Sequence, residues 1–265
     1  MPRILTIDDP ADDRLRLYRD VKDRDLSGRE GLFMAEGQVV LERLFRSKQA
    51  VCISVLTTAD RLKGLDILSL GPDVPVYVVD QAVMDAVAGF AIHRGYLALG
   101  RYAPPADLTH VLTRPGQLRV LALSAISNTD NMGGLMRNAA AFGIDAVLID
   151  RACCDPLYRK AIRVSVGGVF EVPHFRVDDL LAVCRDHGLT PYALSPSGEM
   201  RLDEVRPVER SAFLFGAEGP GLAPGILSTC VSVRIDMHGG FDSLNVATTS
   251  GIVLYQLARR TVQAK

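Results

Sequence analysis

The strongest constraint on the fold is the order of elements in the second half of the chain. From about residue 118, apolar runs alternate with glycine-rich turns and helical segments, as in VLALSAIS, NTDNMGGLMRNAAAFG and IDAVLID. Further strands are expected at LTPYALS, SAFLFG and CVSVRI, before a final helix over 246–260. Such alternation predicts an α/β fold, with a mostly parallel sheet flanked by helices.

The first part of the chain predicts a smaller α/β unit. Residues 8–30 mix acids with arginines, which is typical of a solvated helix face. Within FMAEGQVVLERLFRS, apolar residues fall at helical spacing. VCISVLTT and VPVYVVD are expected to be buried strands, followed by a helix over 81–88. RYAPPADLTHVLTRPG holds three prolines and indicates a boundary. We therefore expect domains at 1–105 and 118–265 with a linker at 106–117.

Composition excludes several classes of protein. The chain has 265 residues, 48% of them hydrophobic, and 30 Lys and Arg against 31 Asp and Glu, for a net charge of −1. The hydrophobic content argues against intrinsic disorder. The near-zero net charge argues against a surface that is basic all over, as many nucleic-acid-binding proteins have, but it is compatible with a local basic patch. Charged residues, glycines and prolines interrupt every apolar run, so we expect no membrane span, no signal peptide and a cytoplasmic location.

The cysteine pattern points to buried thiols and not to a metal site. The five cysteines are odd in number, scattered along the chain and without a C-x-x-C pair. A zinc site needs a regular spacing of Cys and His ligands, so we expect reduced thiols and no metal.

Three polar clusters follow predicted strands of the second half, at 128–138, 214–222 and 235–246. In an open parallel sheet, ligands bind beyond the carboxyl ends of the strands, which makes these clusters the expected site. None of them is a dinucleotide-binding loop, a phosphate loop or a serine hydrolase elbow. The absence of a first-strand glycine fingerprint also argues against a nucleotide-dependent oxidoreductase.

Each cluster also has a purely structural interpretation. Asn131 is expected to cap the helix that follows, and Arg137 either presents its guanidinium to a phosphate or is an ordinary surface arginine. Glu218 lies in a glycine-rich turn where it is either solvated or functional. Ser243 or Asn245 is expected to cap the final helix.

Taken together in this order, the clusters resemble the signature motifs of the SpoU (TrmH-like) family of RNA ribose 2′-O-methyltransferases, in the SPOUT superfamily. Residues 131–137 resemble N-x-G-x-x-x-R, residues 216–222 resemble G-x-E-G-x-G-L, and residues 235–246 resemble I-x-M ending in S-L-N-V. FMAEG and residues 92–95 are similar to an L30e-like substrate-binding domain. Two departures, Asp130 and Asp236, stand where the family often has Pro, which would fix φ and remove a donor.

The resemblance implies a trefoil-knotted domain that holds S-adenosylmethionine in the knot, and a homodimer that completes the site. It assigns cofactor binding to seven positions: Leu194, Ser195, Gly216, Gly221, Ile235, Met237 and Leu244. It assigns catalysis to Arg137, with Asn131, Glu218, Ser243 and Asn245 holding the geometry. No metal is required, because the positive charge of the sulfonium already activates the leaving group.

The implied reaction moves a methyl group from the sulfonium to a ribose 2′-hydroxyl. A guanidinium stays protonated at neutral pH and is therefore a poor base, so our hypothesis is that Arg137 binds the adjacent phosphate and stabilises the developing alkoxide. The added L30e-like domain favours ribosomal RNA as the substrate, with tRNA as the second candidate. A catalytically inactive relative that only binds RNA is a further alternative.

Overall fold

The computed structural model describes residues 2–19, 31–88, 95–104, 106–206, 208–239 and 241–262. The chain forms two compact units: unit 1 contains residues 1–105 and 155–171, and unit 2 contains 106–154 and 172–265. The sequence interpretations of residues 20–30 and 92–94 lie outside the described residues. The expected linker includes a short helix, α5 (Leu108–Leu112), which Asp107 caps by accepting from the His110 amide at 2.7 Å.

Unit 1 is built on a five-stranded sheet with the order β1-β4-β3-β5-β2. Strands β1, β4 and β3 run parallel, whereas β5 is antiparallel to both β3 and β2. The strands are β1 (Arg3–Thr6), β2 (Leu32–Glu36), β3 (Ala50–Thr58), β4 (Pro75–Val79) and β5 (Tyr96–Tyr102). The two β-branched runs thus form β3 and β4 as predicted, while β2 begins where the sequence indicated only a helix.

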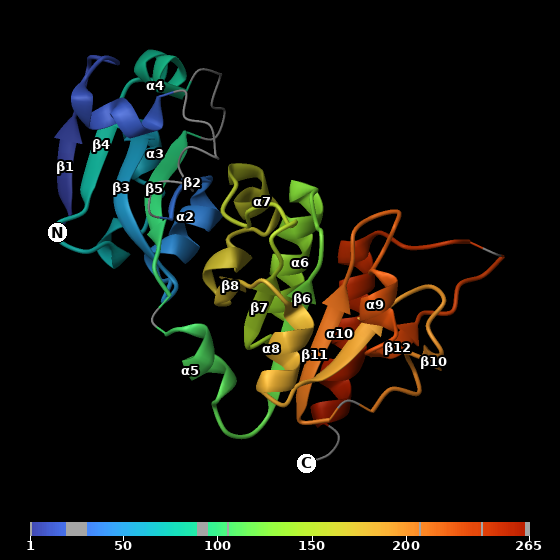
Figure 1. Ribbon diagram of the computed structural model, residues 1–265. Coiled ribbons are helices and arrows are strands. Elements are labelled where there is room, and N and C mark those ends of the chain that lie inside the picture. The colour runs from blue at the N-terminus through green and yellow to red at the C-terminus, as the bar shows by residue number, and fades with distance from the viewer. Residues whose placement is uncertain are drawn as a thin grey trace. The chain divides into compact units, whose positions relative to one another are not determined.

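Short helices complete unit 1 (Figure 1). The helix predicted over 81–88 is confirmed as α4, and the apolar spacing after FMAEG forms α2. Within its described part, residues 8–19, the opening stretch forms a 3-10 helix, η1, and not an α-helix. The elements are η1 (Asp13–Tyr18), α2 (Gln38–Phe45), α3 (Ala59–Leu62), η2 (Ile67–Ser69) and α4 (Gln81–Ala88). Residues Leu15, Leu56 and Met84 share one core cluster and are 0% exposed, so η1 and α4 pack on this sheet.

Residues 155–171 also belong to unit 1, although their sequence neighbours on both sides belong to unit 2. This segment forms α7 (Arg159–Val164) and η3 (Gly168–Phe170). Phe170 stacks on Phe33 of β2 with ring centroids 4.9 Å apart, and its carbonyl accepts from Ser47 Oγ at 2.8 Å. Both rings are fully buried, so the segment supplies part of the core of unit 1.

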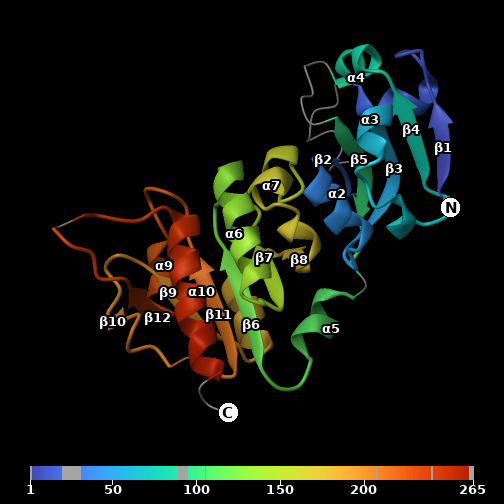
Figure 2. The ribbon, with the colours of Figure 1, turned by 180° about the vertical axis from the view of Figure 1, so that it is seen from behind.

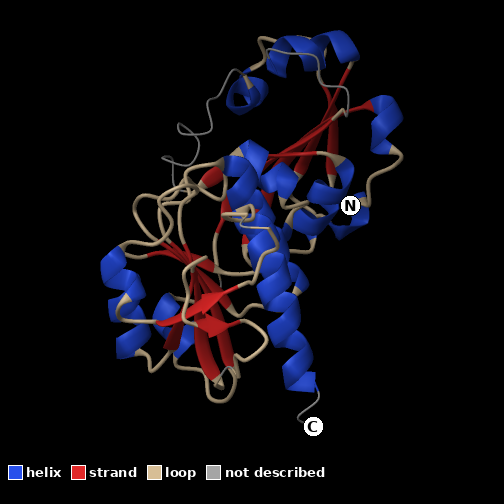
Figure 3. Cartoon of the chain, turned by 90° about the vertical axis from the view of Figure 1, so that its right-hand side faces the viewer, coloured by secondary structure: helices blue, strands red, loops and turns tan. Residues whose placement is uncertain are grey.

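Unit 2 contains a seven-stranded sheet with the order β10-β12-β9-β11-β6-β7-β8, and every recorded pair in it is parallel. The strands are β6 (Leu118–Leu123), β7 (Ala146–Ile149), β8 (His174–Arg176), β9 (Thr190–Leu194), β10 (Met200–Arg201), β11 (Arg210–Phe215) and β12 (Val231–Arg234). Four helices join α5 in this unit: α6 (Thr129–Ala141), α8 (Leu180–Asp186), α9 (Pro224–Leu227) and α10 (Val246–Val262). The predicted parallel sheet flanked by helices is confirmed (Figure 3).

The central strands of unit 2 are buried on both faces. Along β6 and β11 almost every residue is inaccessible, which explains why these segments are continuous apolar runs without polar alternation. Burial also raises the pKa of the Cys153 and Cys184 thiols to about 12, in line with the expected reduced cysteines. Strand order does not show whether the chain threads through a loop of its own, so the trefoil knot stays a prediction.

Helices α6 and α10 pack closely together (Figure 2). A Cβ on Gly134 would lie 2.6 Å from the Ala247 Cβ, so only glycine allows this approach. Next to it, Asn138 Nδ2 donates to the Ala247 carbonyl at 2.7 Å and to Ser250 Oγ at 2.8 Å. The first polar cluster is therefore joined to the helix that follows the third. Among the described residues, no helix combines the length and hydropathy that a bilayer crossing requires.

Candidate functional site

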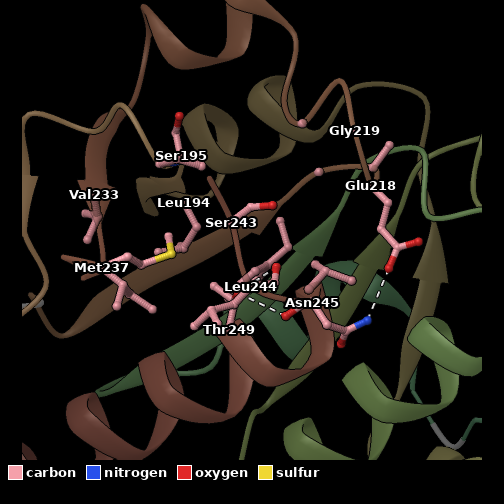
Figure 4. A pocket seen from close by; sticks show the side chains of 17 residues that line it. Leu194, Ser195, Glu218, Gly219, Val233, Met237, Ser243, Leu244, Asn245 and Thr249 are labelled. Carbon is pink, nitrogen blue, oxygen red and sulfur yellow. Dashed lines mark hydrogen bonds between the residues drawn. The ribbon is translucent and has the colours of Figure 1, made fainter. Parts of the chain in front are cut away.

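A cavity of about 340 Å³ lies at the carboxyl ends of β9, β11 and β12 (Figure 4). Leu194 and Ser195 line it from the end of β9, and Gly216 and Gly221 from the loop after β11. The segment after β12 adds Ile235, Met237 and Leu244. All seven positions that the resemblance assigned to the cofactor thus surround one cavity, which lies where an open parallel sheet is expected to bind its ligand.

The five candidate catalytic residues lie in three different places. Glu218, Ser243 and Asn245 line the cavity. Asn131 does not line it but is buried beside it on α6, where its Oδ1 accepts from Asn245 Nδ2 at 2.8 Å. Arg137 belongs to neither set and is described below.

Asn245 connects the three polar clusters. Its Oδ1 accepts from the Ala247 amide at 2.9 Å and the Thr248 amide at 3.2 Å, so it caps α10 as predicted. Its Nδ2 donates to Asn131 Oδ1 at 2.8 Å. The same nitrogen donates to Glu218 Oε1 at 3.1 Å (Figure 4). The cap bonds use the oxygen, and they therefore leave the NH₂ group to hold α6 and the loop after β11.

The prediction that Asn131 caps α6 is wrong. The helix begins three residues earlier, because Asn128 Oδ1 accepts from the Asp130 amide at 2.7 Å and the Asn131 amide at 3.3 Å. Asn131 therefore lies inside the first turn, and its side chain is available for Asn245.

The loop after β11 depends on one glycine. A Cβ on Gly216 would lie 2.4 Å from the Gly221 carbonyl carbon and 2.4 Å from the Leu222 nitrogen. The loop closes on itself there, with the Gly221 amide donating to the Ala217 carbonyl at 3.0 Å. Gly221 itself has a φ of +68°, which favours glycine. This tight loop places backbone groups and Glu218 at the rim of the cavity.

Arg137 is exposed on α6 and does not line this cavity. It follows Asn131 by six residues, which turns it roughly 240° around the helix, away from the Asn131 side chain. Among the described residues, no ion pair or hydrogen bond of its guanidinium is recorded. A single chain thus brings together four of the five candidate catalytic residues, and Arg137 is the exception.

The sequence patterns did not indicate two features, one that lines the cavity and one in the turn before α6. Val233 lines the cavity with Ile235 and Met237, and the period-two alternation of an extended segment would have revealed it. Asp150, at the end of β7, accepts from Ser124 Oγ at 2.8 Å and from the Ala125 amide at 3.0 Å. Burial raises the pKa of Asp150, but these hydrogen bonds outweigh it and the pKa lies below its usual value. Asp150 thereby fixes the turn that leads into α6.

Comparison with known proteins identifies the family. The model of the SpoU rRNA Methylase family matches residues 118–255. An uncharacterized tRNA/rRNA methyltransferase of Mycobacterium tuberculosis is 37% identical over 263 residues, covering 95% of this chain and 90% of the relative. The chain belongs to the SpoU rRNA methylase family. It is thus an RNA methyltransferase, and the family expected from the motifs is confirmed.

Two further similar proteins are informative. A 23S rRNA (guanosine-2′-O-)-methyltransferase of Acinetobacter baylyi is 31% identical over 187 residues, covering 67% of this chain and 75% of the relative. The crystal structure of an AdoMet-bound rRNA methyltransferase from Sinorhizobium meliloti superposes with a TM-score of 0.82 at 20% identity, covering 98% of each chain. At that identity the likeness concerns the fold, and it extends over both units of this SpoU chain.

Proposed function

We propose that this SpoU protein transfers a methyl group from S-adenosylmethionine to a ribose 2′-hydroxyl of structured RNA, with ribosomal RNA as the favoured substrate. The observation that carries the proposal is the Asn245 network, which joins Asn131 and Glu218 at the rim of the cavity. The A. baylyi relative is named as an rRNA 2′-O-methyltransferase. The mycobacterial relative is named for tRNA and rRNA together, so tRNA is the second candidate substrate.

The cavity fits S-adenosylmethionine in size and chemistry. Its volume of about 340 Å³ lies within the usual range for small-molecule sites, roughly 300 to 1,000 Å³. Leu194, Val233 and Ile235 offer an apolar surface for an adenine ring, while the loop from Gly216 to Gly221 exposes backbone polar groups. When bound, the cofactor supplies an activated methyl group, so the protein has to align the two reactants and stabilise the developing charge.

Completing the site requires Arg137, and we propose that a second copy of the chain supplies it. Helices α6 and α10 lie together, and α10 exposes Ile252 (40%) and Tyr255 (51%) to solvent. Phe142, at the end of α6, packs edge-on to Tyr255 with ring centroids 6.2 Å apart. Exposed apolar side chains on α10, beside α6, favour a protein interface on this face. In a homodimer through this face, Arg137 of one copy would serve the cavity of the other.

Two measurements test the proposed function. Calorimetry should show S-adenosylmethionine binding to the wild-type chain, whereas an inactive RNA-binding relative would give no heat. Mapping of 2′-O-methylation in total RNA, with and without the gene, should then reveal one lost site in rRNA. If the lost site lies in tRNA, the substrate assignment is wrong while the reaction assignment stands.

The role of Arg137 is tested by Arg137→Lys, which keeps the charge but loses the planar fork. We expect turnover to fall about 100-fold while cofactor binding is kept, because one transition-state contact is lost. Arg185→Lys, at an exposed arginine of α8, is the matched control and should keep full activity. Near-normal turnover of Arg137→Lys would contradict the assignment.

A further inference from the structure

The segment between β12 and α10 is anchored at both of its ends. At its start, Asp236 Oδ1 accepts from Arg234 Nε at 3.0 Å, and Asp236 Oδ2 lies 3.1 Å from Arg201 Nε. Arg234 also donates to the Gly198 carbonyl at 2.9 Å, so this end is held against the loop before β10. At its other end, Asn245 is fixed by the network described above.

Between these anchors the segment exposes an aromatic ring. Figures 1 and 2 show the segment between β12 and α10 extending away from the rest of unit 2. Phe241 within it is 70% exposed, whereas Phe33, Phe170, Phe213 and Phe215 are each at most 1% exposed. The Phe241 backbone is held loosely, with its amide 3.5 Å from the His238 carbonyl. The chain thus displays at this loop the kind of side chain that it buries elsewhere.

The ring is also close to the cavity along the chain. Ser243, two residues after Phe241, lines the cavity, and two residues span at most about 7 Å. Met237, four residues before, lines it as well, so the chain enters and leaves the exposed part at the cavity. Phe241 is therefore within reach of a ligand that lies at the rim of the cavity.

We propose that Phe241 stacks on a base of the substrate RNA, next to the nucleotide whose ribose is methylated. The inference rests on the proposed function and adds to it a residue that contacts the substrate. Proteins that bind unpaired RNA place aromatic side chains against base faces, because every base offers a π surface. A loop that is anchored at both ends and carries a solvated phenyl ring provides such a surface.

The chain contains no tryptophan, which allows a direct test. Phe241→Trp creates a single fluorescent reporter, and we expect rRNA from a strain lacking the gene to quench it in the presence of S-adenosylhomocysteine. Val208→Trp is the matched control. Val208 is 50% exposed but precedes β11, at the amino end of the sheet and thus away from the cavity, so its fluorescence should not change.

Enzyme kinetics give the second readout. Phe241→Ala should raise the KM for RNA by about tenfold or more, because base stacking on an aromatic ring is lost. Cofactor affinity should be unchanged, and Phe241→Tyr should restore the KM for RNA. A structural defect would instead lower cofactor binding and would not be rescued in this selective way.

Three results would overturn the proposal. Quenching by S-adenosylhomocysteine alone would make Phe241 a cover for the cofactor. Quenching that depends on protein concentration without RNA would make it an interface between two copies. An unchanged KM for RNA in Phe241→Ala would exclude stacking. Failure of the proposed function is distinguishable from these, because wild-type protein would then methylate no RNA, whereas the Phe241→Trp signal is measured without turnover.

Discussion

The substitution Asn245→Asp separates the two roles of the side chain that joins the polar clusters. Aspartate keeps the oxygen that caps α10 towards Ala247 and Thr248. It removes the NH₂ group that donates to Asn131 and Glu218, and it places a carboxylate against two acceptor oxygens. The helix should therefore stay capped while the contact between the clusters becomes repulsive.

The expected cost follows from the geometry. Loss of the hydrogen bond to the charged Glu218 costs about 1.5 kcal/mol, the low end of the usual range for bonds to charged groups, because the pair is exposed. Loss of the hydrogen bond to Asn131 costs about 0.5 to 1 kcal/mol. Two like charges at the observed separation of 3.1 Å repel by about 1 kcal/mol in a water-like dielectric. We therefore expect the free energy of unfolding to fall by about 3 kcal/mol.

Denaturant unfolding and cofactor calorimetry measure these effects. Asn245→Ser keeps a capping oxygen without the added charge, so it should lose about 1 kcal/mol less than Asn245→Asp. Adding Glu218→Gln to Asn245→Asp should recover part of the loss, because the amide can donate to the new carboxylate. If Glu218→Gln gives no recovery, or if Asn245→Asp binds the cofactor as tightly as wild type, the role given to this network is wrong.

Two further predictions concern the loop after β11 and a buried histidine. Gly216→Ala should abolish cofactor binding, because its Cβ would meet the Gly221 backbone at 2.4 Å, whereas Gly225→Ala, with open space around it, should bind normally in calorimetry. Burial, with a smaller contribution from Arg176, lowers the pKa of His174 to about 3. The unfolded chain then binds the proton more tightly, so stability is fully present above about pH 6.5 and falls towards pH 3. Between pH 7 and pH 5 the loss should be about 2 kcal/mol by denaturant unfolding, and His174→Gln should remove it.

Much of the fold could be predicted from local patterns. The β-branched runs gave β3 and β4, and the alternation after residue 118 gave the parallel sheet, because side-chain periodicity reflects burial directly. The start of α6 was misplaced because Asn128 and Asn131 are both good caps, and composition alone does not rank them. The strand β2 was missed because it is directly followed by a helical pattern.

The candidate site was predictable where residues follow strand ends and not where it depends on distant packing. Ile235 and Met237 lie directly after a strand, and the sheet brings them to the same edge as Gly216. Which face of α6 meets the cavity depends on how the helix packs against α10, and local sequence patterns do not indicate this packing. Nothing local in the sequence indicates that Phe170 stacks on Phe33, since 136 intervening residues separate them.

That last contact limits how the protein can be divided. A fragment ending at residue 105 would expose Phe33, because its stacking partner Phe170 would be missing. A fragment starting at residue 106 would carry Ile162 and Phe170 without the sheet that buries them. Both fragments would expose apolar surface to solvent and would tend to aggregate. Exchanging unit 1 with that of a relative therefore requires grafting residues 155–171 along with residues 1–105, as one interdependent piece.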